Sequence, residues 1–179
     1  AKKELKNGGE FNLLQCDLIL ADGVLHNLTA AIIGLTIFEN IGQFTITGTI
    51  SIQDSYNLAS LGPIIGQEYL RLKIATPNLS GGENTIDFTK NPLMIIAVDD
   101  RENVGNGVQV TTMSFCSREF ILNQQARVRR TLVGSYSEIV QMMLKTDLDS
   151  DKAMNIQPSA DNKKINAPNI KPLASIPAI

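Results

Sequence analysis

Few residues of this 179-residue sequence are of types that carry out chemistry in enzymes. His26 is the only imidazole, and it follows Gly23-Val24-Leu25 beside a predicted turn, where a histidine is ordinarily a surface residue rather than a general base. The run Asp99-Asp100-Arg101-Glu102 offers paired carboxylates, but it precedes a turn signal at Gly105 and is typical of a solvated strand end. Neither pattern predicts a catalytic site.

The sequence contains none of the short motifs that bind nucleotides or calcium, and none that carries a nucleophilic serine. The two cysteines lie a hundred residues apart. One histidine and two distant cysteines exclude a zinc site built from those residue types. We therefore expect no cofactor, no metal and no enzymatic activity, and a structural or binding role instead. Cys16 and Cys116 are expected to be reduced, partly buried thiols, although the sequence alone leaves a disulfide open.

The only basic cluster is Arg127-Val128-Arg129-Arg130. In a strand, Arg127 and Arg129 would share one face and Arg130 the other, which does not make a fork for a phosphate group. We expect an ion-paired surface or an interface with a partner. The formal net charge of −2 also argues against a dedicated nucleic-acid binder, since phosphate contacts need a positive excess.

The strongest structural signal is the strict alternation from Phe44 to Gln53. It predicts a long strand with one dry face and one wet, uncharged face. Gly48 interrupts the dry row, which indicates a bulge, a bend or a close backbone neighbour. The dry row is Phe44, Ile46, Ile50 and Ile52, and the wet row is Thr45, Thr47, Thr49, Ser51 and Gln53.

Further strands are predicted over residues 11–20, 28–38, 68–74, 86–88, 93–98 and 108–116, with turn signals at Asn40-Ile41-Gly42 and Gly105-Asn106-Gly107. A single helical turn is expected after Asp54, ended by Gly62-Pro63. The pattern predicts a mostly β fold, an antiparallel two-sheet sandwich or barrel. No stretch has the roughly 18–20 continuous apolar residues that span a bilayer.

One main helix is predicted over 136–146, because Ser135-Tyr136-Ser137-Glu138 has the spacing of a capping box and an apolar stripe follows it. Beyond Asp147 the composition changes to Pro, Asn and Lys with little periodicity. We expect an N-terminal arm over 1–10, a β-domain over 11–134 and the helix over 135–147. Residues 148–179 are expected to form an extended linker or arm, or the start of a further domain.

Two stretches have the order of elements of a known family. The strand from Gly48 ends in Asp54-Ser55 and leads through Gly66-Gln67-Glu68 into the next strand. This resembles the N-terminal tail-tube-like domain of baseplate hub proteins from contractile-tailed, T-even-like phages, which show a strand ending in Asp-Ser, a Gly-x-Glu turn and a strand. The strand over 108–117, an Arg-containing turn and the helix over 137–144 follow in the same order, and the run 165–172 resembles the linker before the next segment of those hubs.

The resemblance covers about Leu13 to Pro172 and implies a two-sheet fold shared with tail-tube subunits. It also implies a trimeric or hexameric ring around a channel, which connects the tail tube to the central spike. The implied partners are further copies of the chain, the central spike protein, the tail tube and other baseplate proteins, with transient passage of DNA and no membrane insertion. The implied location is the tail baseplate of the virion, assembled in the bacterial host cytoplasm.

Those hubs carry two tube domains per chain, whereas this chain has room for one. We therefore expect either a piece of a longer hub, which we favour, or a one-domain relative. The tail beyond Asp147 is expected to be ordered mainly by neighbouring subunits. Subunit or partner contacts are expected at Arg127, Arg129, Arg130, Ile165, Ile170 and Leu173.

An uncharged polar wall suits a channel through which DNA must slide, because fixed positive charge would hold the phosphates. The wet row Thr45, Thr47, Thr49, Ser51 and Gln53 is accordingly the expected channel lining. Two alternatives stay open: a tube or spike component of a contractile secretion or bacteriocin machine, and a small all-β binding module. The binding module is disfavoured because such modules usually present clustered Trp or Tyr, and Trp is absent.

Overall fold

The structure is a computed structural model that describes residues 11–40, 42–54, 64–77, 83–105 and 108–176. It divides into two compact units, which we call the first and the second unit. The first comprises the chain to Phe38 together with Thr47–Ser117, and the second comprises Glu39–Ile46 together with Arg118–Ile179. The division differs from the expected β-domain over 11–134, because the chain from Arg118 onward builds a core of its own.

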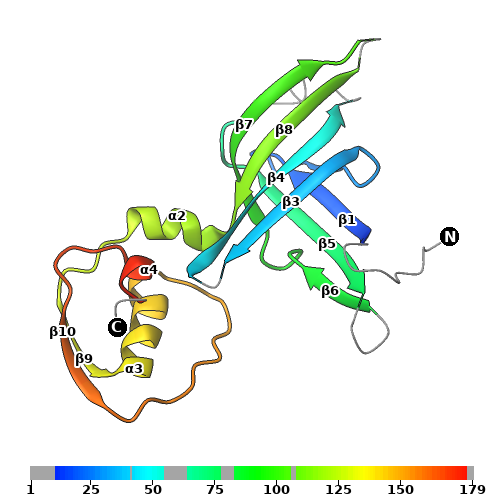
Figure 1. The fold of residues 1–179 in the computed structure, drawn as a ribbon. Coiled ribbons are helices and arrows are strands. Elements are labelled where there is room, and N and C mark those ends of the chain that lie inside the picture. Colours follow the sequence, from blue (N-terminus) through cyan, green and yellow to red (C-terminus); the bar gives the residue numbers. More distant parts are fainter. Residues whose placement is uncertain (1–10, 41, 55–63, 78–82, 106–107, 177–179) are drawn as a thin grey trace. The chain divides into compact units, whose positions relative to one another are not determined.

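Antiparallel strands make up the first unit, as the sequence predicts (Figure 1). In the described residues they form an eight-stranded sheet with the order β2-β1-β5-β7-β8-β4-β3, and β6 pairs with β5. The strands are β1 (Asn12–Ile19), β2 (Leu25–Asn27), β3 (Ile32–Asn40), β4 (Gln43–Asp54), β5 (Tyr69–Pro77), β6 (Glu83–Asp87), β7 (Leu93–Asn103) and β8 (Gln109–Cys116).

The two halves of this sheet are joined at one narrow point. β5 and β7 share only the register pairs Tyr69↔Met94 and Leu70↔Leu93. The strands on either side of this junction contribute to one continuous core, in which Leu18 and Leu72 come from one half and Ile50 and Phe115 from the other. The result is a sandwich made from a single bent sheet, which confirms the predicted fold class.

The predicted alternation in β4 is confirmed where the strand belongs to the first unit, since Ile50 and Ile52 are fully buried. Gly48 has the close neighbour that its position indicated. A Cβ atom there would lie 2.3 Å from the carbonyl oxygen of Thr36 and 2.4 Å from Cζ of Phe115. Phe44 departs from the predicted dry row and is 46% exposed, because it lies in the part of β4 that belongs to the second unit.

A glutamate fixes the turn that leads into β5. Glu68 is fully buried, and its carboxylate accepts hydrogen bonds from the backbone N–H groups of Ile65 and Gly66, each at 2.8 Å. Gly66 adopts a φ of +86°, which a residue with a side chain rarely adopts. The Gly-x-Glu sequence is therefore a self-capped turn.

Helices and a two-stranded ribbon make up most of the second unit (Figure 1). The capping box is confirmed: Ser135 Oγ accepts a hydrogen bond from the Glu138 N–H, and the Glu138 carboxylate accepts one from the Ser135 N–H at 2.8 Å. Helix α2, the ribbon and α4 were not predicted. The elements are α2 (Arg118–Gln125), β9 (Thr131–Ser135), α3 (Tyr136–Met142), a π-helical turn η1 (Met143–Asp147), β10 (Asn162–Asn166) and α4 (Pro172–Ser175).

The expectation of an extended arm over 148–179 is corrected. The segment includes β10, which pairs with β9 from Asn162↔Ser135 to Asn166↔Thr131, and it also includes α4. Ile165 and Ile170 pack against the core cluster of the second unit, and Leu173 is 6% exposed. These side chains were expected on a partner subunit, but Ile165 and Ile170 are partly buried and Leu173 is buried within their own chain. The arm lacks enough apolar surface alone, and the rest of the second unit supplies it.

Three expectations lie outside the described residues: the N-terminal arm over 1–10, the helical turn after Asp54 and its end at Gly62-Pro63. In the described part of the chain, no helix is long and apolar enough to cross a membrane.

Candidate functional site

Hydroxyl groups cover the surface of β4 and β8 that faces away from the core. On β4 the half-buried Thr47, Thr49 and Ser51 alternate with fully buried residues. The register places Ser114 opposite Thr49 and Thr112 opposite Ser51, and the hydroxyl oxygens of Ser51 and Thr112 lie 2.9 Å apart. We call Thr47, Thr49, Ser51, Thr112 and Ser114 the hydroxyl face.

Acidic side chains border the hydroxyl face on the next strand, β7. Asp99 accepts a hydrogen bond of 2.6 Å from Ser114 Oγ, and Asp100 stands opposite Thr112 in the register. The surface is thus uncharged on β4 and β8 and acidic on β7. Such a surface repels phosphate groups rather than binding them.

Gln53 continues the hydroxyl face near the end of β4, where it is exposed and stands opposite Val110. One predicted wet-row residue lies outside this face. Thr45 belongs to the second unit, where it lines a pocket of about 250 Å³. Conversely, Thr112 and Ser114 were not predicted, although the alternation of β8 carries the signal that would have found them.

Strand β3 presents a long edge that no other described strand covers, since it ends the sheet order. It is nine residues long, and Glu39 is its only charged residue. Ile33 and Phe38 on this strand are 57% and 59% exposed. A long apolar edge with free backbone groups is a template for pairing with another chain.

Strand β7 also has an uncovered stretch, because beyond Met94 it has no register pair with β5 among the described residues. This stretch differs from β3 in two ways. The register shifts between Ile95 and Ala97 and again between Val98 and Asp100, and four consecutive charged residues follow. Bulges and charges are the devices by which natural sheets prevent pairing at an edge. The sheet therefore has one protected and one unprotected long edge.

The predicted arginine cluster is not a strand, although Val128 makes a single bridge to Ile170. Arg127 Nη1 donates to the carbonyl oxygens of Gln124 and Ala126 and so closes the end of α2. Arg130 Nη2 lies 2.8 Å from Asp147 Oδ2. Arg129 is exposed and has no hydrogen bond or ion pair to another described residue. The second unit thus uses two of the three arginines internally.

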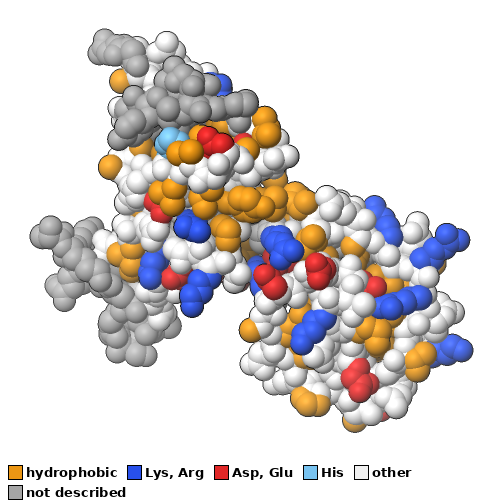
Figure 2. Space-filling model, turned by 180° about the vertical axis from the view of Figure 1, so that it is seen from behind, with side chains coloured by type: hydrophobic (Ala, Val, Ile, Leu, Met, Phe, Trp, Pro, Cys, Tyr) orange, Lys and Arg blue, Asp and Glu red, His pale blue; other side chains and the backbone are white. Residues whose placement is uncertain are grey.

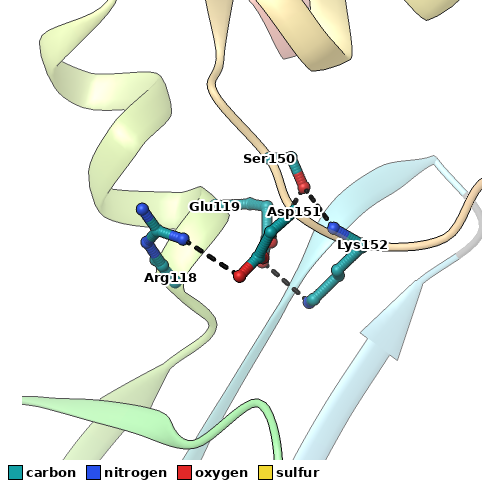
Figure 3. Close-up of polar contacts among 5 residues, drawn as sticks. All are labelled: Arg118, Glu119, Ser150, Asp151 and Lys152. Carbon is teal, nitrogen blue, oxygen red and sulfur yellow. Dashed lines mark hydrogen bonds and ion pairs between the residues drawn. The ribbon is translucent and has the colours of Figure 1, made fainter.

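A second polar cluster, which we call the α2 clasp, holds the start of α2 to the segment after η1 (Figure 3). Glu119 is 5% exposed and lies 2.7 Å from Lys152 Nζ, and Ser150 Oγ donates to its other oxygen at 3.2 Å. Beside them, Arg118 and Asp151 form an exposed ion pair at 3.4 Å. No local sequence pattern predicts this cluster, because its members are about thirty residues apart.

Cys16 and Cys116 are both buried and form no disulfide with each other in the structure. Burial raises the pKa of Cys16 from 9.0 to about 12, and the neighbouring Asp17 charge also acts to raise it. The thiol is therefore neutral and unreactive at physiological pH. Among the described residues, no group of His, Cys, Asp and Glu is placed to hold a metal ion.

No family model matches the sequence, and no curated protein matches it. Three structures of a PdpA–VgrG complex, two of them described as from Francisella, contain chains with a similar coarse fold. The lidded form matches at 17% identity over 86% of this chain and 23% of that chain, with a TM-score of 0.42. The half-lidded form matches at 16% identity over 87% of this chain and 26% of that chain, with a TM-score of 0.39. The lidless form matches at 15% identity over 86% of this chain and 29% of that chain, with a TM-score of 0.39. This chain spans less than a third of those chains.

Proposed function

We propose that this chain is a structural ring subunit of a contractile injection machine, of the tail-tube type, without enzymatic activity. The observation that carries the proposal is the unprotected β3 edge, next in the sheet to the strand that bears the hydroxyl face. Bulges and charges protect one long edge of this sheet against strand pairing, whereas the β3 edge lacks such protection. The β3 edge is therefore suited to pairing with a strand of another chain.

Pairing at β3 would join neighbouring subunits through backbone hydrogen bonds. Such bonds are directional, so they set the angle between subunits and with it the number of copies in a closed ring. Ile33 and Phe38 would lose their exposure in the contact, which adds a hydrophobic contribution of about 25 cal/mol for each Å² of apolar surface buried.

The hydroxyl face would line the channel of that ring. Because β4 is the sheet neighbour of β3, a strand added at β3 would continue this face from one subunit to the next. A lining of Thr and Ser has no positive charge to hold DNA or an acidic protein in transit, and the exposed carboxylates of β7 border this lining rather than form part of it.

Two finer versions of the proposal differ in the machine to which the ring belongs. In one, the chain is a phage baseplate hub between the tail tube and the central spike, located in the virion. In the other, it is a tube or spike component of a contractile secretion or bacteriocin machine. Both versions use the same β3 edge and the same hydroxyl face. Co-assembly of the chain with the tube and spike proteins of each machine therefore distinguishes them.

The test of ring formation compares two substitutions of exposed isoleucines. We expect the wild-type chain, with tube and spike partners present, to form closed threefold or sixfold rings by sedimentation and electron microscopy. Ile33→Lys on the open β3 edge is expected to abolish the rings, because a lysine protects an edge. Ile96→Lys on the bulged β7 edge is the matched control, as Ile96 is 41% exposed, and it is expected to leave the rings intact. A wild-type chain that stays monomeric at high concentration contradicts the proposal.

A further inference from the structure

The β9–β10 ribbon of the second unit has one buried and one open face. Leu132 and its register partner Ile165 pack toward the core. The register pair Val133↔Lys164 points the other way, and Val133 is 63% exposed. Arg129 is exposed just before β9, with the buried Val128 and Leu132 on either side of it along the chain. We call Arg129, Val133 and Lys164 the basic ribbon.

The two cations of the basic ribbon are unused inside the chain. The side chains of Arg129 and Lys164 have no hydrogen bond or ion pair with another described residue, whereas Arg130 and Lys152 are paired with carboxylates. The second unit as a whole contains nine Lys and Arg against seven Asp and Glu, and the first unit contains seven against eleven. Lys and Arg side chains gather on the side of the second unit that carries the ribbon (Figure 2).

A surface of the opposite charge occurs on the first unit. Asp100 and Glu102 are separated by one residue on β7, so they share a face of the strand, and Val104 continues the same spacing. All three are exposed, Val104 to 62%, and neither carboxylate has an ion pair within the described residues. We call these three residues the acidic row.

We propose that the basic ribbon of one copy of the chain binds the acidic row of a second copy. The inference rests on the proposed ring function, in which each subunit meets its neighbour through two different surfaces. Each surface combines two unpaired charges of one sign with one exposed valine. The two surfaces are therefore opposite in charge and alike in apolar character. Contact between Val133 and Val104 would exclude water from the ion pairs around them, which strengthens those pairs.

The valines favour a protein partner over nucleic acid. A phosphate backbone offers no apolar surface to Val133, and two cations are few for a duplex-binding surface. The acidic row lies on β7, and the β3 edge lies beyond β8 and β4 in the sheet order. A partner bound at the acidic row therefore occupies a different strand from the β3 edge.

Charge reversal tests the contact in the full chain. Arg129→Glu with Lys164→Glu, or Asp100→Lys with Glu102→Lys, is expected to weaken self-association about tenfold or more, since like charges are then opposed. All four substitutions together are expected to restore self-association.

The matched control for the ribbon variant is Lys90→Glu with Lys145→Glu, which makes the same change in net charge at exposed positions outside both surfaces and is expected to have little effect. Lys164→Gln removes one positive charge without reversing it and should weaken self-association less than the double reversal does. Wild-type association should weaken with added salt.

The outcomes separate this inference from the proposed function. Suppose that rings form and that Ile33→Lys abolishes them. If the charge reversals then behave like the control, or if the fourfold variant does not recover self-association, the proposed contact is wrong and the ring function stands. If the ribbon variant loses binding to a short DNA duplex and keeps its self-association, the ribbon is a nucleic-acid surface and the contact is again wrong. A wild-type chain that stays monomeric overturns both.

Discussion

Neighbouring residues of β4 have opposite environments, and substitutions there test the assignment of its faces. Ile50 is fully buried between the two halves of the sheet, whereas Thr49 is half-buried on the hydroxyl face. Ile50→Ala is expected to lower the free energy of unfolding by about 2–5 kcal/mol, out of a total of about 5–15. Thr49→Ala is expected to change it by about 0.5 kcal/mol. Urea denaturation measures both, and equal losses would contradict the assignment.

Gly48 is the position at which a single methyl group has no room. A Cβ atom would meet the backbone oxygen of Thr36 at 2.3 Å and the ring of Phe115 at 2.4 Å. Gly48→Ala is therefore expected to displace β3 or Phe115 and to lower the free energy of unfolding by several kcal/mol, measured by urea denaturation. The double variant Gly48→Ala with Phe115→Leu should recover only part of the loss, because the carbonyl oxygen cannot be moved by a side-chain change. Full recovery would show that the ring alone causes the clash.

Asp87 is expected to give the first unit a pH dependence in the acidic range. Hydrogen bonds from the Thr89 hydroxyl and N–H, with a further contribution from Lys73 at 3.1 Å, lower the pKa of this carboxyl from 3.8 to about 2. Because the folded pKa lies below the unfolded one, the stabilisation is present above pH 3.8 and is lost as the pH falls toward 2.

Asp87→Asn is therefore expected to be less stable than wild type at neutral pH, and the difference should shrink below about pH 4. Thr89→Val keeps the backbone and Lys73 donors and should remove only part of this pH dependence. Thermal unfolding across the pH range measures both. A difference that stays constant down to about pH 2 would contradict the role given to Asp87.

At the scale of elements, the α2 clasp decides how firmly α2 is held in the second unit. Glu119 is buried and Lys152 is its cationic partner, so Lys152→Met leaves a carboxylate without its charge partner (Figure 3). We expect a loss of about 1–3 kcal/mol, seen as faster hydrogen exchange of the α2 amides. Arg118→Met breaks the adjacent ion pair, whose side chains are 45% and 65% exposed, and should cost about 0–1 kcal/mol. Equal effects of the two substitutions would mean that burial of Glu119 does not matter.

At the scale of the whole molecule, the two core clusters predict that the units depend differently on the end of the chain. Deleting residues 148–179 removes Ala167, the packing of Ile165 and Ile170, and the partner strand of β9. The core of the first unit includes none of these residues. The truncated chain is expected to keep its β-sheet circular dichroism and its protected cysteines, to lose the helical signal of α3, and to assemble poorly.

Assembly of the truncated chain is measured by sedimentation, with wild type as the reference. If complete rings still form without residues 148–179, the second unit is not an assembly element. If the cysteines become reactive, the first unit does not fold independently.

The sequence by itself determined the elements whose signals are local. The alternation of β4 and the capping box at Ser135 each depend on residues within a few positions of one another, so each could be predicted and each is present. The Gly-x-Glu turn is equally local and is present, although it was expected from the family resemblance. The mostly β, antiparallel fold follows from such short-range patterns. The hydroxyl side chains of β4 were predicted in the same way, because side-chain direction in a strand alternates with a period of two.

Only the tertiary structure decided which segments complete each core and which edges stay open. β10 pairs with β9 across a gap of more than two dozen residues, so the tail has the composition of an arm in the sequence and is a core component in the fold. The clasp between Glu119 and Lys152, the contrast between the β3 and β7 edges, and the pairing of Thr112 with Ser51 also arise from strand order and register. A linear pattern determines where a side chain points along its own element, whereas its neighbours are set by long-range packing.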